Sequence, residues 1–468
     1  MGFNPWNAFH EFFTEKDAFE TIDYLVSSGL VEAGYTYFNL DDGWMMPRDG
    51  DSALQPNLTM YPSGIKGIAD YAHSKGLKVG IYSSAGTNTC KGFPASLGYE
   101  DQDAKMWAEW GVDLVKYDNC YSAASDKSIK ERYEAMRDAI LASGRPMVFA
   151  VCEWGLSEPW VYGQSVGHMW RTTKDISLDI AATWPGILEN LDSTARLARY
   201  AGPGGWNDAD MLEVGPPGNA KLTLAEQRAH FALWAVIKSP LIIGADLKLL
   251  KPSELKILKA KEVIAINQDP LGVAGDLVWK QGPEEVWAAP LQGGGRAVVL
   301  FNRQMAAEGV TSRELTVHWH QIGYEPGIQV KVRDLYKGKD LGEFTGHFKG
   351  TVINHGALIL RLTPTEAHES HERWRPWPCS SDPSHGSQGA YACPSNALMQ
   401  RSESVLKQAD VPSSTYGFAG YILTSVGGVF LGLMVGLSPL RGVLGRWVRG
   451  RQYRELHSPH ALALSDRV

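Results

Sequence analysis

The sequence is poor in cysteine, with five in 468 residues, which excludes a small protein held together mainly by disulfides. It has no CxxC, HExxH or clustered Cys/His motif and no GxxxxGK[ST] loop, so neither a metal nor a cofactor is predicted. Lys and Arg total 45 against 52 Asp and Glu, and this net charge of −7 does not indicate a nucleic-acid partner. Residues 1–6 lack the basic start and apolar core of a signal peptide.

The composition is that of a globular chain with a large core, since 44% of the residues are hydrophobic and 10% are aromatic. Its length predicts several domains, although a single α/β barrel can use about 250 residues. Cys90 with Cys120 and Cys379 with Cys393 are two conceivable pairs that leave Cys152 alone, but spacing does not determine the pairing.

In the C-terminal region, residues 416–437 include no charged residue, and five arginines follow at 441, 446, 449, 451 and 454. As a helix, this stretch crosses a bilayer core of about 30 Å. We therefore predict a transmembrane helix at 416–440 and a basic cytoplasmic tail at 441–468, with the rest of the chain extracellular or luminal. The alternatives are a buried helix and a secreted protein.

Gly428, Gly432 and Gly436 of this segment form a double GxxxG motif, which permits a homodimer in the membrane. Export of the preceding residues also requires an early signal, so we expect the native transcript to encode an upstream signal sequence. The sequon at Asn57 agrees with a luminal location.

From residue 2 to about 270, short apolar runs alternate with amphipathic stretches that predict helices. The eight predicted strands are 2–6, 35–41, 78–83, 114–118, 147–153, 169–173, 204–208 and 241–245. Eight strand–helix units over this length favour a (β/α)8 TIM barrel at 1–270 rather than an open doubly wound sheet.

Beyond residue 270 the pattern changes to short alternating strands bounded by Gly, Pro and Asn. The predicted strands are 287–290, 296–301, 315–318, 329–334, 349–353 and 356–362. This pattern predicts an antiparallel β-sandwich domain at 271–363. Residues 364–415 are rich in Ser, Pro, Glu and His and are interpreted as a polar linker.

The C-terminal ends of barrel strands form the active-site rim in this fold. Acidic residues end or follow most of the predicted strands, while Lys116 and Arg171 are the obvious cations there. Many carboxylates on one rim repel each other unless a metal, cations or a ligand rich in hydroxyl groups compensates, and no His accompanies them as a metal site would usually require. With Trp6 and Trp154 as flat apolar surfaces, the pattern indicates a sugar, but spacing alone does not select two catalytic carboxyl groups.

Six ordered motifs resemble the melibiase-type α-galactosidases of glycoside hydrolase family 27. They are Met1-Gly2-Phe3-Asn4-Pro5-Trp6-Asn7-Ala8-Phe9, Leu40-Asp41-Asp42-Gly43-Trp44, Lys116-Tyr117-Asp118-Asn119-Cys120, Cys152-Glu153-Trp154-Gly155, Trp170-Arg171-Thr172-Thr173 and Gly202-Pro203-Gly204-Gly205-Trp206-Asn207-Asp208-Ala209-Asp210-Met211-Leu212. The resemblance runs from residue 1 to about 363 and implies a barrel followed by an antiparallel β domain. Phe3 and Ala209 depart from the usual family residues, Trp and Pro.

The resemblance implies a retaining exo-α-galactosidase that removes terminal α-D-galactose. Asp118 is similar to the family's nucleophile and Asp175 to its acid/base residue, and such a pair lies about 5–5.5 Å apart. It also implies a disulfide between Cys90 and Cys120. The implied substrate-binding residues are Trp6, Asp41, Asp42, Tyr82, Lys116, Glu153, Trp154, Arg171, Asp210 and Met211.

Two other functions stay open at this point. In the related α-N-acetylgalactosaminidases, small residues make room for the acetamido group, whereas Glu153 would bind a free 2-hydroxyl and crowd an N-acetyl group. A non-catalytic galactose-binding barrel is the second alternative, but such a protein would not need both Asp118 and Asp175.

Overall fold

A computed structural model describes residues 1–178, 183–218, 221–304 and 311–366. The predicted polar linker lies almost wholly outside these residues, and the predicted membrane span and cytoplasmic tail lie entirely outside them. Within the described ranges, no helix is both long and apolar enough to cross a membrane.

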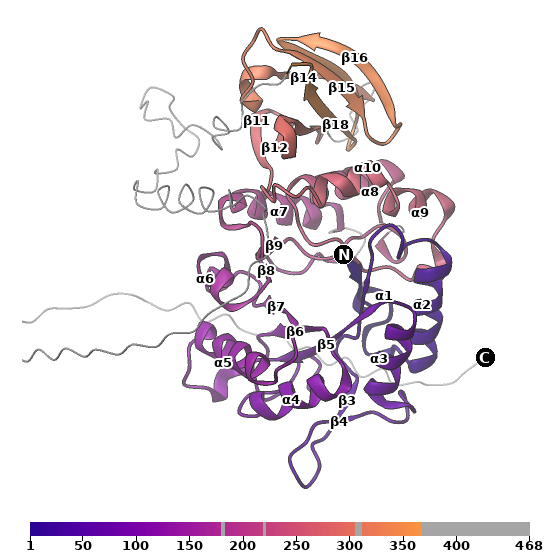
Figure 1. The fold of residues 1–468 in the computed structure, drawn as a ribbon, viewed down its shortest axis with the longest axis vertical. Coiled ribbons are helices and arrows are strands. Elements are labelled where there is room, and N and C mark those ends of the chain that lie inside the picture. Colours follow the sequence, from indigo (N-terminus) through magenta and orange to yellow (C-terminus); the bar gives the residue numbers. More distant parts are fainter. Residues whose placement is uncertain (179–182, 219–220, 305–310, 367–468) are drawn as a thin grey trace, which may run out of the picture. The chain divides into compact units, whose positions relative to one another are not determined.

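The N-terminal part contains an eight-stranded parallel sheet in the order β10-β1-β2-β5-β6-β7-β8-β9 (Figure 1). Its strands are β1 (Gly2–Phe3), β2 (Tyr37–Asn39), β5 (Lys78–Ser84), β6 (Leu114–Asp118), β7 (Val148–Cys152), β8 (Met169–Arg171), β9 (Trp206–Asp208) and β10 (Ile242–Ile243). A short antiparallel hairpin, with the two-residue strands β3 (Met45–Met46) and β4 (Gln55–Pro56), extends from the loop after β2.

The sheet curls until its two edges meet. Leu212, just beyond β9, forms a parallel bridge with Ile243 of β10. The fold is therefore TIM-barrel-like, and a strand is present at each of the eight predicted places. Most are shorter than predicted because the chain turns at their ends; after β2, for example, the backbone amide of Asp42 binds the side chain of Asp41.

Helices connect the parallel strands and cover the outside of the sheet (Figure 1). They are α1 (Trp6–Phe9), α2 (Glu15–Ser27), α3 (Gly64–Ser74), α4 (Glu100–Trp110), α5 (Ile129–Ala142), α6 (Pro159–Val166), α7 (Thr183–Ala195), α8 (Leu224–Val236), α9 (Pro252–Leu258) and α10 (Lys261–Asn267). Thr14, Ser128 and Thr223 begin α2, α5 and α8 with reciprocal capping boxes, which satisfy backbone amides at the first turn.

The C-terminal part has a six-stranded antiparallel sheet, β11-β12-β13-β18-β15-β16, and a separate antiparallel pair, β14-β17. The strands are β11 (Asp276–Gln281), β12 (Glu284–Pro290), β13 (Arg296–Asn302), β14 (Ser312–His318), β15 (Gln329–Asp334), β16 (Lys339–Thr345), β17 (His347–Ile353) and β18 (Ala357–Pro364). A separate apolar core that includes Val298, Val317, Trp319 and Leu360 lies between the sheet and the pair.

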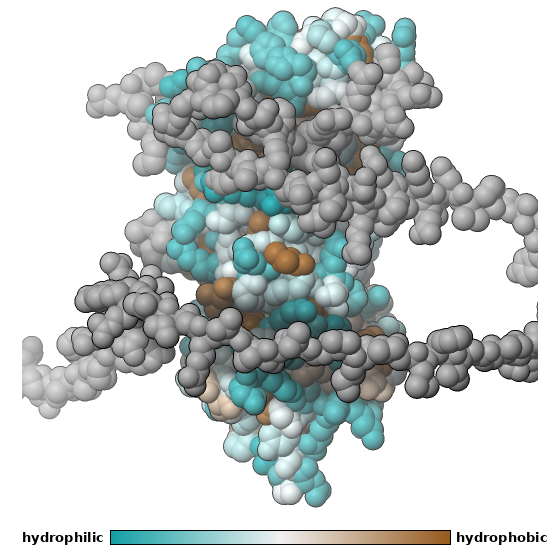
Figure 2. Space-filling view, turned by 90° about the vertical axis from the view of Figure 1, so that its left-hand side faces the viewer, coloured by the Kyte–Doolittle hydropathy of each residue, from teal (hydrophilic) through white to brown (hydrophobic). Residues whose placement is uncertain are grey.

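Two edge strands, β11 and β16, were not predicted from the sequence. Neither has a buried residue, so their side chains do not show the alternation of apolar and polar residues that marks a half-buried strand. On the face shown in Figure 2, hydrophobic residues form separate patches among hydrophilic ones.

Candidate active site

Asp118, the last residue of β6, is a buried carboxylate with one partnered oxygen. Its Oδ2 accepts a 2.8 Å hydrogen bond from the hydroxyl group of Tyr82 on the neighbouring strand β5. Among the described residues, its Oδ1 has no hydrogen-bond partner. A buried carboxylate with one free oxygen is poorly solvated, which suits a group that reacts with a bound ligand.

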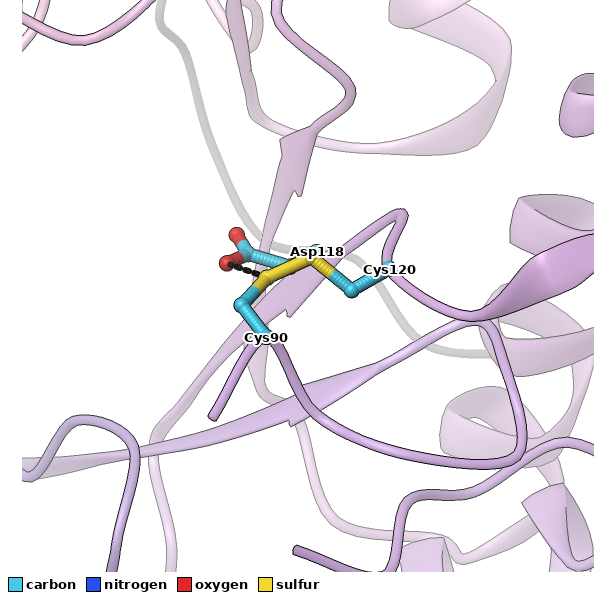
Figure 3. Close-up of side chains that lie close together, drawn as sticks. All are labelled: Cys90, Asp118 and Cys120. Carbon is cyan, nitrogen blue, oxygen red and sulfur yellow. Dashed lines mark hydrogen bonds between the residues drawn. A yellow bond between two sulfur atoms is a disulfide. The ribbon is translucent and has the colours of Figure 1, made fainter. Parts of the chain in front are cut away.

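The structure confirms the disulfide between Cys90 and Cys120, and its sulfur lies directly beside Asp118 (Figure 3). Sγ of Cys90 is 3.3 Å from Oδ2 of Asp118. In the described part of the chain, these three residues are the one group of Cys, His, Asp or Glu side chains close enough to share a metal. Because both sulfurs are used in the disulfide, the group is not a metal site; the disulfide instead holds the loop with Cys90 against the end of β6.

Asp41 and Lys116 form the next part of the site. Nζ of Lys116 is 2.8 Å from Oδ2 of Asp41, and the side-chain amide of Asn4 donates to the same oxygen at 2.6 Å. Burial opposes the charge on Lys116, but Asp41 and Asp118 raise its pKa well above the usual value. Lys116 is therefore a fixed cation between two carboxylates.

Asp42 is buried next to Asp41. Its Oδ2 accepts a 2.9 Å hydrogen bond from the backbone amide of Lys91, on the loop that carries Cys90. Its Oδ1 has no partner in the described residues. Burial raises the pKa of Asp42 to about 6, so this carboxyl titrates close to neutral pH.

Arg171, the last residue of β8, binds two carboxylates at once. Its Nη2 is 2.9 Å from Oδ1 of Asp175, and its Nη1 is 3.1 Å from Oδ1 of Asp210. Asp210 has a left-handed backbone with φ of 87°, an uncommon conformation for a residue other than glycine. Backbone amides of Ile176 and Met211 hold its carboxylate in place, so the loops after β8 and β9 are joined at this point.

A cavity of about 50 Å³ lies inside the curled sheet, and its lining extends from Leu114 and Met169, which begin β6 and β8, to the strand ends. Its lining includes Asn4, Lys116, Cys152, Arg171, Asp210 and Met211. Trp6, at the start of α1, is half-buried, with Nζ of Lys91 5.6 Å from its ring centre. The site thus combines buried carboxylates, two cations and an aromatic ring, which are the groups that bind a sugar.

Comparison with known proteins agrees with this geometry. Residues 8–269 match the family described as alpha galactosidase A, and residues 281–362 match the alpha galactosidase C-terminal beta sandwich domain. The chain is 46% identical to alpha-galactosidase 3 of Arabidopsis thaliana over 375 residues, which are 79% of this chain and 83% of that protein. It is 44% identical to an alpha-galactosidase of Cyamopsis tetragonoloba over 366 residues, 78% of this chain and 86% of that protein.

The chain belongs to the melibiase family of α-galactosidases. The fold agrees as well. The crystal structure of alpha-galactosidase I from Mortierella vinacea superposes with a TM-score of 0.73 at 35% identity, covering 77% of this chain and 96% of that one.

Within this member of the melibiase family, the two expected catalytic carboxyl groups are in different environments. Burial raises the pKa of Asp118, although Lys116 opposes the shift. The surrounding protein opposes ionisation of Asp175 too, but Arg171 and Lys116 outweigh it and lower its pKa. Lys116 acts on both groups, so they face a common cation. The pKa values of the two groups are therefore shifted in opposite directions, and Asp118 is the harder of the two to ionise.

Glu153 and Trp154 follow β7 and are placed differently from each other. The Trp154 side chain helps to stabilise the carboxylate of Asp175. Glu153 is fully buried, its Oε2 accepts from the backbone amide of Ser157 at 2.9 Å, and its Oε1 has no partner in the described residues. Burial raises the pKa of Glu153 to about 7.

Two residues of the site were missed by the sequence analysis. Asn4 fixes Asp41 and also accepts from the backbone amide of Trp6. Cys152, the free buried cysteine opposite Asp118 in the sheet register, lies 3.9 Å from Nη1 of Arg171. Both lie within the family motifs quoted above. The sequence signal that could have identified them is their position at the end of a buried strand, since Asn4 follows β1 and Cys152 ends β7.

Proposed function

We propose that the protein is a retaining exo-α-galactosidase, a glycoside hydrolase that removes terminal α-linked galactose from oligosaccharides and glycoconjugates. The observation that carries this proposal is the buried carboxylate of Asp118, with one oxygen fixed by Tyr82 and the other without a partner in the described residues. In addition, the chain belongs to a family in which curated relatives 42–46% identical to it are named α-galactosidases.

In the proposed reaction, Asp118 attacks the anomeric carbon while Asp175 donates a proton to the leaving oxygen. The glycosidic C–O bond breaks, and a galactosyl ester forms on Asp118. Asp175, now ionised, takes a proton from water, whose oxygen attacks the anomeric carbon and releases galactose with its original α configuration. This step needs ionised Asp118 and protonated Asp175, which is the reverse of the directions in which the free protein shifts the two pKa values. A leaving oxygen that accepts a proton from Asp175, and positive charge developing next to Asp118, both favour the reversal.

The binding residues have roles that follow from their charges. Asp41 and Asp42 would accept hydrogen bonds from the 4- and 6-hydroxyls, Lys116 would donate to neighbouring hydroxyls, and Trp6 would cover an apolar face of the ring. Tyr82, Trp154, Arg171, Asp210 and Met211 would complete the subsite. The support for these roles is that the ion pairs Asp41–Lys116 and Arg171–Asp210 lie at the strand ends.

The test is turnover of an aryl α-galactoside by the purified protein and by Asp118→Asn. We expect turnover by the wild type and a loss of at least about 10³-fold in the variant, since loss of a nucleophile removes most of the rate enhancement. Galactose binding by the variant, measured by calorimetry, checks its fold. A well-folded wild type that binds galactose without turnover would leave only the non-catalytic galactose-binding function.

Preference for galactose over its N-acetylated analogue is the finer part of the proposal, and it depends on Glu153. Replacing Glu153 with Ser removes the buried carboxylate and makes room near carbon 2, so the ratio of kcat/KM for the two sugars should move toward the N-acetyl substrate. Equal cleavage of both sugars by the wild type would contradict the role of Glu153 and favour the α-N-acetylgalactosaminidase alternative.

We also propose that residues 416–440 anchor the protein in a membrane, with the catalytic part outside or luminal. The support is the uncharged stretch, the arginines after it, the Cys90–Cys120 disulfide and the sequon at Asn57. Carbonate extraction of the full-length protein, with and without residues 416–468, tests the anchor. Release of both forms into the soluble fraction would contradict it and would leave a secreted protein.

A further inference from the structure

Helix α7 contacts the loop with Asp175 on one side and the β domain on the other. The residues that contact the loop are 186, 189 and 190, whereas those that contact the β domain are 184 and 192. At about 100° per residue, these two sets lie on nearly opposite sides of the helix. In Figure 1, α7 accordingly lies between the ends of β8 and β9 and strand β12.

On the loop side, the side-chain amide of Asn190 binds two backbone carbonyls. Nδ2 donates to the carbonyl of Lys174, which precedes Asp175, at 3.0 Å, and to that of Ala209, which precedes Asp210, at 3.2 Å. Asn190 is fully buried, so these contacts are shielded from water. Nζ of Lys174 is also 2.9 Å from a carboxylate oxygen of Glu189, and Gly186 lies against Ile176 and Ser177.

On the β-domain side, an aromatic contact and an ion pair hold α7. The ring of Trp184 lies edge-on to Phe301 of β13 at 6.1 Å between ring centres and 5.5 Å from the ring of His355. Nη1 of Arg303 donates to Oδ2 of Asp192 at 3.0 Å. Arg303 is fixed in turn by the buried Glu285 of β12, 2.6 Å from its Nε.

We propose that the β domain positions the acid/base residue Asp175 through α7, with Asn190, Trp184 and Asp192 as positioning residues. The inference rests on the proposed function, because it assigns a role within that reaction. Asp175 is on an irregular segment, and its side chain is 67% exposed, so little packing of its own holds it in place. The carbonyl next to it is fixed by a helix that the β domain supports from the opposite side.

A misplaced acid/base group has a kinetic signature that general loss of structure does not produce. Departure of an alkoxide requires protonation, whereas a nitrophenolate leaves with little help from an acid. Displacing Asp175 should therefore slow cleavage of methyl α-galactoside much more than cleavage of 4-nitrophenyl α-galactoside. Because the second step needs the same group as a base, added azide, which attacks without a base, should restore part of the turnover of the nitrophenyl substrate.

The experiment compares Asn190→Ala, Trp184→Ala and Asp192→Asn in the full chain. For Asn190→Ala and Trp184→Ala, we expect kcat/KM for the methyl substrate to fall at least about ten-fold more than that for the nitrophenyl substrate. Asp192→Asn is nearly isosteric and partly exposed, so it should fold and show the same trend to a smaller extent. Trp184→Phe retains an aromatic contact and should restore most of the ratio.

The matched control is Glu262→Gln. Glu262 forms another ion pair between the barrel and the β domain, with its Oε2 2.6 Å from Nε of Arg333 of β15, and none of its bonds among the described residues involves α7. Its ratio of the two rates should equal that of the wild type. Equal loss on both substrates in the α7 variants, no loss in any of them, or the same change in Glu262→Gln would overturn the inference. Absence of turnover in the wild type would instead contradict the proposed function.

Discussion

Nη2 of Arg171 lies 2.9 Å from Oδ1 of Asp175, so the expected proton donor is paired with a cation in the free protein. The pair explains why Asp175, although exposed at the rim, has a lowered pKa. Asp118, the proposed nucleophile, is buried and shows the opposite shift, because desolvation raises its pKa. The reactive arrangement, ionised Asp118 with protonated Asp175, is therefore the minor one of the two singly protonated forms.

This order makes a prediction about the pH dependence of kcat/KM, which reports on the free enzyme. With the higher pKa on Asp118, activity falls at alkaline pH as Asp118 loses the last proton of the pair. It falls at acidic pH as Asp175 gains a second proton. We expect the Tyr82→Phe variant to identify the groups: losing the hydroxyl that stabilises the carboxylate should raise the pKa of Asp118 by about one unit.

The alkaline side of the profile should therefore move upward in Tyr82→Phe while the acidic side stays in place. The measurement is kcat/KM for one aryl α-galactoside over a pH series, with galactose binding as the check on folding. A shift confined to the acidic side would show that Asp175, and not Asp118, holds the proton in the free enzyme.

The disulfide provides a second prediction. Cys90 and Cys120 are 30 positions apart, and removing a link across a loop of this length lowers the free energy of unfolding by about 3–4 kcal/mol. We expect Cys90→Ser with Cys120→Ser to lower the free energy of unfolding by that amount and so to lower the denaturation midpoint. Because Cys90 also contacts Asp118, kcat should fall as well. An unchanged denaturation midpoint would contradict a structural role for the disulfide.

A third prediction concerns stability and pH. Glu153 has a pKa of about 7 in the folded protein, above its ordinary value of 4.5. Between these two values the folded state holds a proton that the unfolded state has lost, so stability decreases as pH rises through this window. Burial raises the pKa of Asp42 and of Asp210 as well, each to about 6, which adds to the trend.

Glu153→Gln removes one ionisation and should make the decrease in the free energy of unfolding between pH 4.5 and pH 7 smaller. From pH 4.5 to pH 8, the variant should lose about 1–3 kcal/mol less of its free energy of unfolding than the wild type does. Chemical denaturation of both proteins at the two pH values measures this difference. Glu109→Gln, at an exposed helix position, is the control and should follow the wild type. A decrease as steep as that of the wild type would show that Glu153 does not carry the proton.

Much of the fold was accessible from the sequence because the parallel strands are buried and apolar. The limits of β6 were predicted as they are found, and Asp118 ends it. The edge strands β11 and β16 were missed because their residues are exposed or only partly buried. The choice of Asp118 and Asp175 as the reacting carboxyl groups came from the family resemblance. Burial and ion pairing determine the reactivity of a carboxyl group, and the spacing of residues shows neither.

The contact of Arg171 with Asp210 and those of Asn190 could not be predicted because they join segments distant in the sequence. Asn190 binds carbonyls 16 and 19 positions away, and nothing in a helical sequence marks an amide for that role. For Glu153, the resemblance implied a sugar contact, and the structure adds an orientation that spacing does not show, in which Oε2 accepts from the backbone amide of Ser157. The short loop after β7 determines that orientation.

Identification of the residue that bears the galactosyl ester tests the central claim most directly. A fluorinated galactosyl fluoride that traps the ester, followed by proteolysis and mass spectrometry, measures it. We predict one galactosyl unit per chain, on the peptide that contains Asp118, and none in Asp118→Asn. A label on another carboxylate, or turnover without any labelled peptide, would contradict the assignment of Asp118 as the nucleophile.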